Sequence, residues 1–141
     1  MSNTDQLSNS CDALLVEDNS HFRNKIIQSY LRGCRVIELN QGRHFLQVLE
    51  KYQFHFILMD YELPDNNGEV LVIAAREYAY KGPIIGISSS EYLNQKLLKA
   101  GADASIEKRK SYLLPKVIVQ AISIAGARGF QTQCTYGKES I

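Results

Sequence analysis

The stretch Phe54–Gly68, FHFILMDYELPDNNG, decides the fold that we expect for this chain. It opens with an apolar run, which is typical of a strand that is buried on both faces of a parallel sheet. The run ends on a carboxylate, Asp60, and Pro64 and Gly68 follow closely. Pro64 stiffens the turn, and Gly68 permits a backbone geometry that other residues resist. We therefore interpret the stretch as a buried strand that holds one aspartate still.

Four further short apolar runs alternate with segments of helical periodicity. We expect the other strands at Ala13–Val16, Cys34–Leu39, Pro83–Ser88 and Ala104–Glu107. We expect helices from Ser20, over Phe45–Tyr52, from Val70, over Leu93–Ala100 and over Leu114–Ala125. Parallel strands need helical crossover connections, so five strand–helix units predict an α/β fold, a parallel sheet with helices on both faces.

Length and composition indicate one domain without a strongly charged surface. The chain has 141 residues, and its 16 basic and 15 acidic side chains nearly cancel. Net charge thus suggests neither nucleic acid nor an anionic membrane as a partner. We expect a disordered or loosely attached segment at residues 1–12, a domain at 13–126 and a flexible tail at 127–141. No stretch resembles a signal peptide or is long enough to span a bilayer, so we expect a cytoplasmic protein.

The three cysteines, Cys11, Cys34 and Cys134, lie far apart in the sequence. They form no CxxC pair and show no spacing typical of a metal site. An odd number of separated cysteines in a cytoplasmic protein predicts reduced thiols.

Polar side chains stand where four of the expected strands end. Glu17 and Asp18 follow the first strand, Asp60 ends the third, Ser88 ends the fourth and Lys108 follows the fifth. The carboxyl ends of parallel strands share one edge of the sheet, where ligands bind in open α/β folds. Three crowded carboxylates repel one another unless a cation is present. Mg²⁺ suits this position, because it accepts one or two carboxylates together with a phosphate oxygen.

These groups together predict chemistry on a phosphoryl group. Beside Mg²⁺, Asp60 can stay ionised and act as a nucleophile on phosphorus. Lys108 can neutralise charge on the phosphoryl oxygens, and the Ser88 hydroxyl can donate a hydrogen bond to one of them.

At this point the sequence resembles the receiver domain of two-component response regulators, over about residues 13–125. The motifs that carry the resemblance are LLVEDN with Glu17 and Asp18, ILMDYELPDNNG with Asp60, PIIGISSS with Ser88, and AGADASIEK with Lys108. The resemblance implies a flavodoxin-like fold with strand order 2-1-3-4-5.

The resemblance also implies a role for each site residue. Asp60 would be the phosphoacceptor, and Ser88 and Lys108 would be the switch hydroxyl and the phosphoryl contact. Mg²⁺ would be bound by Glu17, Asp18, Asp60 and the backbone carbonyl of Glu62. Glu62 and Ser90 occupy the positions that tune phosphoryl lifetime in the family.

Two departures from the family pattern stand near Lys108. The family usually has a proline after this lysine, joined by a cis bond, but here the residue is Arg109. A non-proline cis bond costs about 3–4 kcal/mol, so we expect a trans Lys108–Arg109 bond. The family often has an aromatic residue three positions before the lysine, whereas this chain has Ser105. That change puts the usual coupling between hydroxyl and aromatic ring in doubt.

Three functional hypotheses remain at this stage. The first is a stand-alone signalling receiver, not an enzyme beyond self-catalysed phosphorylation and dephosphorylation. The second is a degenerate receiver that binds protein without being phosphorylated. The third is a phosphatase of the haloacid dehalogenase type, but that family has D-x-D at its nucleophile and places its metal acids later. Here the sequence is Asp60-Tyr61-Glu62, and Glu17-Asp18 come earlier.

The resemblance implies the partners of the first hypothesis. A histidine kinase or a histidine phosphotransfer protein would donate the phosphoryl group. A downstream protein, which the sequence does not identify, would bind the surface formed by the fourth helix, the fifth strand and the fifth helix. Dimerisation through that surface is a further expectation. We expect no direct nucleic-acid binding and no membrane association, since the length leaves no room for a DNA-binding output module.

Overall fold

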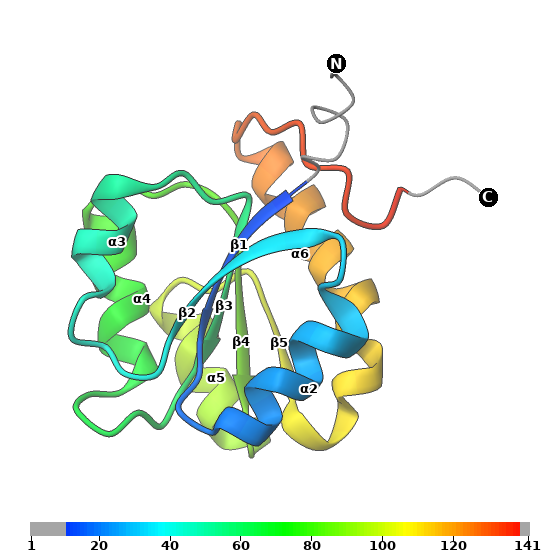
Figure 1. Cartoon of the computed structure of the whole chain (residues 1–141). Coiled ribbons are helices and arrows are strands. Elements are labelled where there is room, and N and C mark those ends of the chain that lie inside the picture. The colour runs from blue at the N-terminus through cyan, green and yellow to red at the C-terminus, as the bar shows by residue number, and fades with distance from the viewer. Residues whose placement is uncertain (1–10, 139–141) are drawn as a thin grey trace.

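The computed structural model describes residues 11–138, in which five parallel strands form one sheet in the order β2-β1-β3-β4-β5 (Figure 1). The strands are β1 (Cys11–Val16), β2 (Cys34–Leu39), β3 (Phe56–Asp60), β4 (Ile84–Ser88) and β5 (Ala104–Glu107). The helices are α2 (Ser20–Tyr30), α3 (Phe45–Lys51), α4 (Gly68–Glu77), α5 (Glu91–Ala100) and α6 (Leu114–Ala127), with a 3₁₀ helix, η1 (Lys108–Leu113), before α6. The expected fold class and strand order are confirmed.

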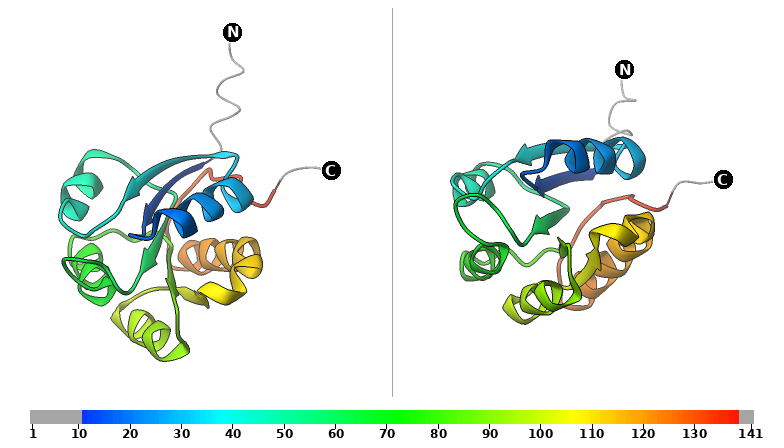
Figure 2. Two further views of the ribbon diagram at one scale, coloured as in Figure 1. Left: turned by 60° about the horizontal axis from the view of Figure 1, so that its bottom comes forward. Right: turned by 90° about the horizontal axis from the view of Figure 1, so that it is seen from below.

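Helices cover both faces of the sheet, as Figure 2 shows. Successive side chains of a strand point to opposite faces, so β1 contributes to two cores. Ala13 and Leu15 pack with α2 and α6, whereas Leu14 and Val16 pack with α3, α4 and α5. The three central strands are buried almost throughout, which explains their apolar sequence.

The helix starts differ in detail from the sequence expectations. Asn19, not Ser20, caps α2, because its side chain accepts a hydrogen bond from the backbone N–H of Phe22 at 2.8 Å. α4 begins at Gly68, two residues before the start that we expected at Val70, and both Val70 and Ile73 are exposed. The buried positions of α4 are instead those of its other apolar stripe, Leu71, Val72 and Ala75.

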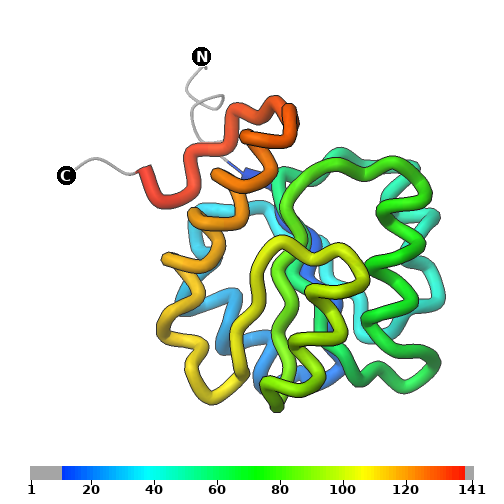
Figure 3. Tube along the Cα trace, turned by 180° about the vertical axis from the view of Figure 1, so that it is seen from behind, coloured from blue at the N-terminus to red at the C-terminus, as the bar shows by residue number. Residues whose placement is uncertain are grey.

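The structure describes part of each segment that we expected to be loosely attached or flexible. β1 begins at Cys11, so residues 11 and 12 belong to the sheet, and residues 1–10 lie outside the described part. We expected a flexible tail at residues 127–141, of which residues 139–141 lie outside the described part. In the structure, α6 continues to Ala127, and the C-terminal segment (residues 128–138) turns back along the amino-terminal edge of the sheet (Figure 3).

The C-terminal segment makes contacts that a free tail would lack. Cys134 is buried, and the ring of Tyr136 packs edge-on against Phe56 with 5.6 Å between ring centroids. The Tyr136 hydroxyl donates a hydrogen bond to the carbonyl of Tyr30 at 2.9 Å. The segment therefore joins the end of α2 to the core beneath β3.

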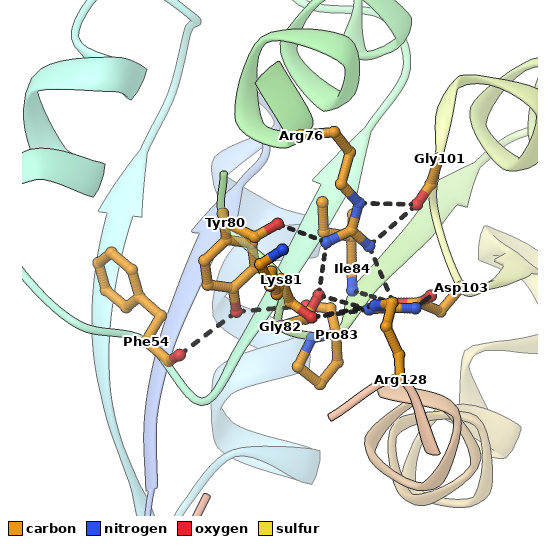
Figure 4. A network of polar contacts seen from close by, with 10 residues as sticks. All are labelled: Phe54, Arg76, Tyr80, Lys81, Gly82, Pro83, Ile84, Gly101, Asp103 and Arg128. Carbon is orange, nitrogen blue, oxygen red and sulfur yellow. Dashed lines mark hydrogen bonds and ion pairs between the residues drawn. The ribbon is translucent and has the colours of Figure 1, made fainter. Parts of the chain in front are cut away.

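Asp103 anchors the start of this segment through two arginines (Figure 4). Its carboxylate accepts hydrogen bonds from Arg76 at 3.0 Å, from Arg128 at 2.7 Å and from the backbone N–H of Ile84 at 3.0 Å. Arg76 also donates to the carbonyls of Tyr80, Gly82 and Gly101. One buried carboxylate thus connects α4, β4 and the end of α6. These contacts lie at the amino-terminal edge of the sheet, opposite to the carboxyl ends of the strands.

Two remaining backbone findings bear on the sequence expectations. All peptide bonds between residues 11 and 138 are trans, so the predicted trans Lys108–Arg109 bond is confirmed. Among the described helices, none combines the length and apolarity that crossing a bilayer requires.

Candidate functional site

The carboxyl ends of β1, β3 and β5 bring four of the predicted residues together. Glu17 and Asp18 follow β1, Asp60 ends β3 and Lys108 follows β5. β3 lies between β1 and β4 in the sheet, so Asp60 occupies a central position at this edge. The edge lies at the opposite end of the strands from the C-terminal segment, which is at the top of Figure 1.

Three carboxylates form an acidic cluster at this edge. One oxygen each from Glu17, Asp18 and Asp60 lies within 4.8 Å of the other two. Glu17 and Asp60 are almost fully buried, with 1% and 4% of their surface exposed, while Asp18 is exposed. Buried carboxylates at this separation repel each other strongly, since the protein interior screens charge poorly.

Lys108 spans the two buried acids. Its Nζ lies 3.0 Å from Glu17 Oε1 and 3.3 Å from Asp60 Oδ2. The ammonium also lies 4.9 Å from the centre of the Phe22 ring, at a distance typical of a cation–π contact. Burial works against the charge of Lys108, but the carboxylates of Asp60 and Glu17 outweigh that effect and raise its pKa. The lysine is therefore held charged next to Asp60.

Asp60 has an unusual pKa for an aspartate. Burial, and then the charge of Glu17, raise the pKa of Asp60 to about 7, although Lys108 acts in the opposite direction. The backbone N–H of Tyr61 donates to Asp60 Oδ1 at 2.8 Å, which also favours the charged form. One ammonium thus does not compensate fully for the burial of this carboxylate beside a second one.

The donor set fits a hard divalent cation. Carboxylate oxygens are the ligands that Mg²⁺ prefers, and three of them face a single ammonium here. Glu17, Asp18 and Asp60 are the residues that would hold the ion. The Glu62 side chain is exposed, and no contact between it and the acidic cluster occurs in the described structure, so only its backbone carbonyl remains a candidate ligand.

The loop after β3 is shaped by close packing at Gly68. A Cβ at this position would collide with the backbone carbonyl of Asp60 and touch the Met59 side chain. The Gly68 N–H donates to the Tyr61 carbonyl at 2.7 Å. Gly68 is not among the residues with positive φ, so space, rather than the unusual backbone geometry that we expected, requires glycine here. Pro64 lies exposed at the tip of this loop.

Ser88 is buried at the end of β4, but its hydroxyl contacts other groups than the acidic cluster. Its Oγ lies 2.8 Å from the Ser90 carbonyl and 2.9 Å from Asn94 Oδ1. The Ser90 side chain caps α5, since its Oγ accepts a hydrogen bond from the Leu93 N–H at 3.1 Å. Ser90 therefore has a structural role, and its lifetime-tuning role stays a prediction.

Asn94 is a site residue that sequence reasoning missed. It is 1% exposed, and its Nδ2 is the buried side-chain nitrogen that has no hydrogen-bond partner among the described residues. The available signal was its position on the apolar stripe of α5, three residues before the buried Leu97. An amide on a buried helix face needs a polar partner, and here that partner is Ser88.

Known proteins share both the sequence pattern and the fold. A family model for the response regulator receiver domain matches residues 13–122. The transcription factor SKN7 of Saccharomyces cerevisiae is 30% identical over 99 residues, which make up 68% of this chain and 15% of that protein. The chain thus spans a small part of the length of that relative.

Solved structures agree with this result. A CheY-like response regulator receiver domain protein from Methanospirillum hungatei JF-1 has a TM-score of 0.70 at 25% identity, over 84% of this chain and 98% of that one. The signal receiver domain of a putative LuxO repressor protein from Vibrio parahaemolyticus has a TM-score of 0.73 at 23% identity, over 84% and 94% of the two chains. Because the family model covers most of the sheet and its helices, this chain belongs to the response regulator receiver domain family.

Proposed function

We propose that Asp60 accepts a phosphoryl group from a phosphohistidine donor in a Mg²⁺-dependent phosphorelay. The observation that carries the proposal is the position of Lys108, which contacts both Glu17 and Asp60 beside a third carboxylate, Asp18. A purely structural ion pair would need one acid and one base. Three acids around one lysine leave excess negative charge, which suits a site that takes up a cation and a phosphoryl group.

The chemistry is an in-line displacement at phosphorus. An oxygen of the Asp60 carboxylate attacks, the P–N bond to the donor imidazole breaks, and the imidazole nitrogen keeps the electron pair. Lys108 neutralises charge that develops on the phosphoryl oxygens, and backbone N–H groups of the loop after β3 donate hydrogen bonds to them. Mg²⁺, when bound, would supply the remaining positive charge on the phosphoryl oxygens.

Glu17 and Asp18 contribute by position and charge. The Asn19 N–H donates to Glu17 Oε2 at 3.0 Å, and Arg23 donates to the Glu17 carbonyl at 2.7 Å. These contacts hold Glu17 in one orientation at the end of β1. Asp18 is the exposed member of the cluster, and it would complete the cation site from the solvent side.

The output of the switch would be a change in the surface formed by α5, β5 and α6. The Ser88 hydroxyl would leave Asn94 and the Ser90 carbonyl and bond to a phosphoryl oxygen, which shifts the loop between β4 and α5. Two exposed aromatic side chains, Tyr92 of α5 and Tyr112 of η1, which joins β5 to α6, offer contacts to a downstream protein or to a second copy of the chain. Ser105 stands where the family often has an aromatic residue. In its place, the Ser88–Asn94 contact would link the movement of the Ser88 hydroxyl to α5.

The donor would be a histidine kinase or a histidine phosphotransfer protein, in the cytoplasm. The test is intact-mass spectrometry after incubation with Mg²⁺ and acetyl phosphate, with Asp60→Ala as the control. A single phosphoryl adduct that requires Mg²⁺ and is absent from the control supports the proposal. Absence of an adduct, also with a panel of kinases, would favour the alternative of a receiver that binds protein without phosphorylation.

A further inference from the structure

The strand register places two cysteines side by side at the amino-terminal edge of the sheet. Cys11 is the first residue of β1, and its partner in the ladder to β2 is Cys34. Neighbouring strands lie about 4.8 Å apart, which is within the range of Cα separations that a disulfide can bridge. Their Sγ atoms lie 2.6 Å apart, closer than the ordinary contact distance of two sulfur atoms. The two thiols already face each other.

The third cysteine joins this pair from the C-terminal segment. Cys134 is buried, and a hydrogen bond links its side chain to that of Cys11. All three cysteines are free thiols in the structure, and we call them the thiol cluster. Cysteines that are 23 and 123 residues from Cys11 in the sequence thus lie beside it, although their spacing showed no motif.

Only one member of the pair is accessible. Cys11 is 2% exposed, whereas Cys34 is partly exposed. A cavity of about 250 Å³, whose lining includes both Cys11 and Cys34, lies between the end of α2 and the C-terminal segment. Its volume can hold a small oxidant such as H₂O₂, and Tyr30 and Tyr136 form part of its wall. A small oxidant can therefore reach Cys34 without unfolding of the sheet.

The environment keeps the inner thiol protonated. A hydrogen bond with Cys134 lowers the pKa of Cys11, but the hydrogen bond with Cys34 and burial outweigh it and raise that pKa to about 12. The hydrogen bond with Cys11, followed by burial, likewise raises the pKa of Cys134. Since thiolates react much faster than thiols, neither buried cysteine is suited to react first.

We propose that Cys11 and Cys34 form a redox-active dithiol that small hydroperoxides oxidise to an intramolecular disulfide. The accessible Cys34 sulfur attacks the peroxide, which gives a sulfenic acid and releases water or, from an organic hydroperoxide, an alcohol. The adjacent Cys11 sulfur then displaces water from the sulfenic acid and forms the S–S bond. In sum, two thiols and one H₂O₂ give one disulfide and two waters.

The disulfide would close the β1–α2–β2 unit at its open end. That unit carries Glu17 and Asp18 at its other end, but the thiol cluster lies at the opposite edge of the sheet from Asp60. Oxidation would also remove the hydrogen bond between Cys11 and Cys134, which is one of several contacts of the C-terminal segment. Oxidation of the two cysteines does not depend on phosphorylation of Asp60. The two proposals can therefore be tested separately.

The experiment maps thiols in the full chain. Reduced protein is treated with a small excess of H₂O₂ and then denatured in the presence of N-ethylmaleimide, which alkylates the remaining free thiols. It is digested without reductant for peptide mass spectrometry. We expect a cross-linked peptide pair that joins Cys11 to Cys34 and whose mass is that of the two peptides minus two hydrogen atoms. Dithiothreitol should restore both thiols in full. Cys134→Ser should keep this cross-link, and both Cys34→Ser and Cys34→Ala should lose it.

Three results would overturn the proposal. The first is alkylation of Cys11 and Cys34 in full after peroxide treatment. The second is a dominant cross-link between Cys11 and Cys134 or between two chains. The third is a Cys11–Cys34 cross-link that forms only in urea, because that would show that the folded pair is not the reactive one. The wild-type measurement decides between these outcomes even where a variant folds poorly.

Discussion

The Ser88 hydroxyl lies 2.9 Å from Asn94 Oδ1, and this contact holds it on the α5 side of the site. A hydroxyl has one proton, so Ser88 donates either to this amide oxygen or to the Ser90 carbonyl at 2.8 Å. The Nδ2 of Asn94 is buried and has no partner in the described part of the chain. The Ser88–Asn94 contact therefore leaves one buried donor unsatisfied. Breaking this contact would free the Ser88 hydroxyl to move, as a switch hydroxyl would.

Replacing Asn94 by leucine should favour phosphorylation. Asn94→Leu removes an acceptor for Ser88 and an unsatisfied buried donor, while it keeps a similar volume. A hydrogen bond is worth about 1 kcal/mol, so we expect acetyl phosphate to modify Asp60 up to about fivefold faster. Stopped-time intact-mass spectrometry measures this rate.

A double variant distinguishes this effect from general loosening of the site. In a Ser88→Ala background, Asn94→Leu should leave the phosphorylation rate unchanged, because the hydroxyl that it releases is absent. An equal increase in both backgrounds would show that Asn94 acts on something other than Ser88.

Lys108→Met should destabilise the protein in a pH-dependent way. The variant leaves Glu17 and Asp60 buried without their cation, which costs about 3–5 kcal/mol at about pH 8. The cost should shrink at about pH 5, since protonation of Asp60 relieves the repulsion. Urea unfolding at the two pH values, without Mg²⁺, measures the difference.

Arg109→Met is the matched control for this prediction. Arg109 pairs with Glu107 at 2.8 Å, but its side chain is largely exposed. Exposed pairs contribute about 0–1 kcal/mol, so the control should change stability little at either pH. Similar losses in the two variants would contradict the central position that we assign to Lys108.

The fold and most of the site were predictable from sequence because each depends on local patterns. Apolar runs predicted five strands, and polar residues at the strand ends predicted Glu17, Asp18, Asp60 and Lys108. Asn94 was not predictable in the same way, because its role depends on how α5 packs against β4. The same holds for the C-terminal segment, whose polar composition suggested a free tail, whereas Tyr136 contacts Phe56 through tertiary packing.

Asp60→Asn should stabilise the metal-free protein at high pH. The pKa of Asp60 is raised from 3.8 to about 7 in the folded state, so the folded protein holds a proton that the unfolded chain has lost. Between about pH 4 and about pH 7, the free energy of unfolding therefore falls as the pH rises. The asparagine has no charge to bury, so we expect a gain of about 4 kcal/mol at about pH 8 and little gain at about pH 4.

Mg²⁺ provides the control for the asparagine variant. The ion should stabilise the wild type at about pH 8 and have a much smaller effect on Asp60→Asn, which lacks one of the three carboxylates. Thermal unfolding with and without Mg²⁺ measures both effects. An equal gain from the ion in the two proteins would argue against Asp60 as a ligand.

Asp103→Ala should be strongly destabilising. The carboxylate is 5% exposed and pairs with Arg76 and Arg128, so its removal leaves the partly buried Arg76 without its counter-charge. Breaking such a pair from one side costs about 3–5 kcal/mol. Asp12→Ala removes the exposed pair with Arg35 and should cost less than about 1 kcal/mol in the same urea titration.

The most direct test of the account locates the phosphoryl group at residue level. The protein is incubated with Mg²⁺ and acetyl phosphate, reduced with borohydride, which converts an aspartyl phosphate to homoserine, and mapped by peptide mass spectrometry. We predict homoserine at position 60, dependent on Mg²⁺ and lost in Lys108→Met. Homoserine at another aspartate, or an unmodified Asp60 under conditions that label an authentic receiver, would contradict it.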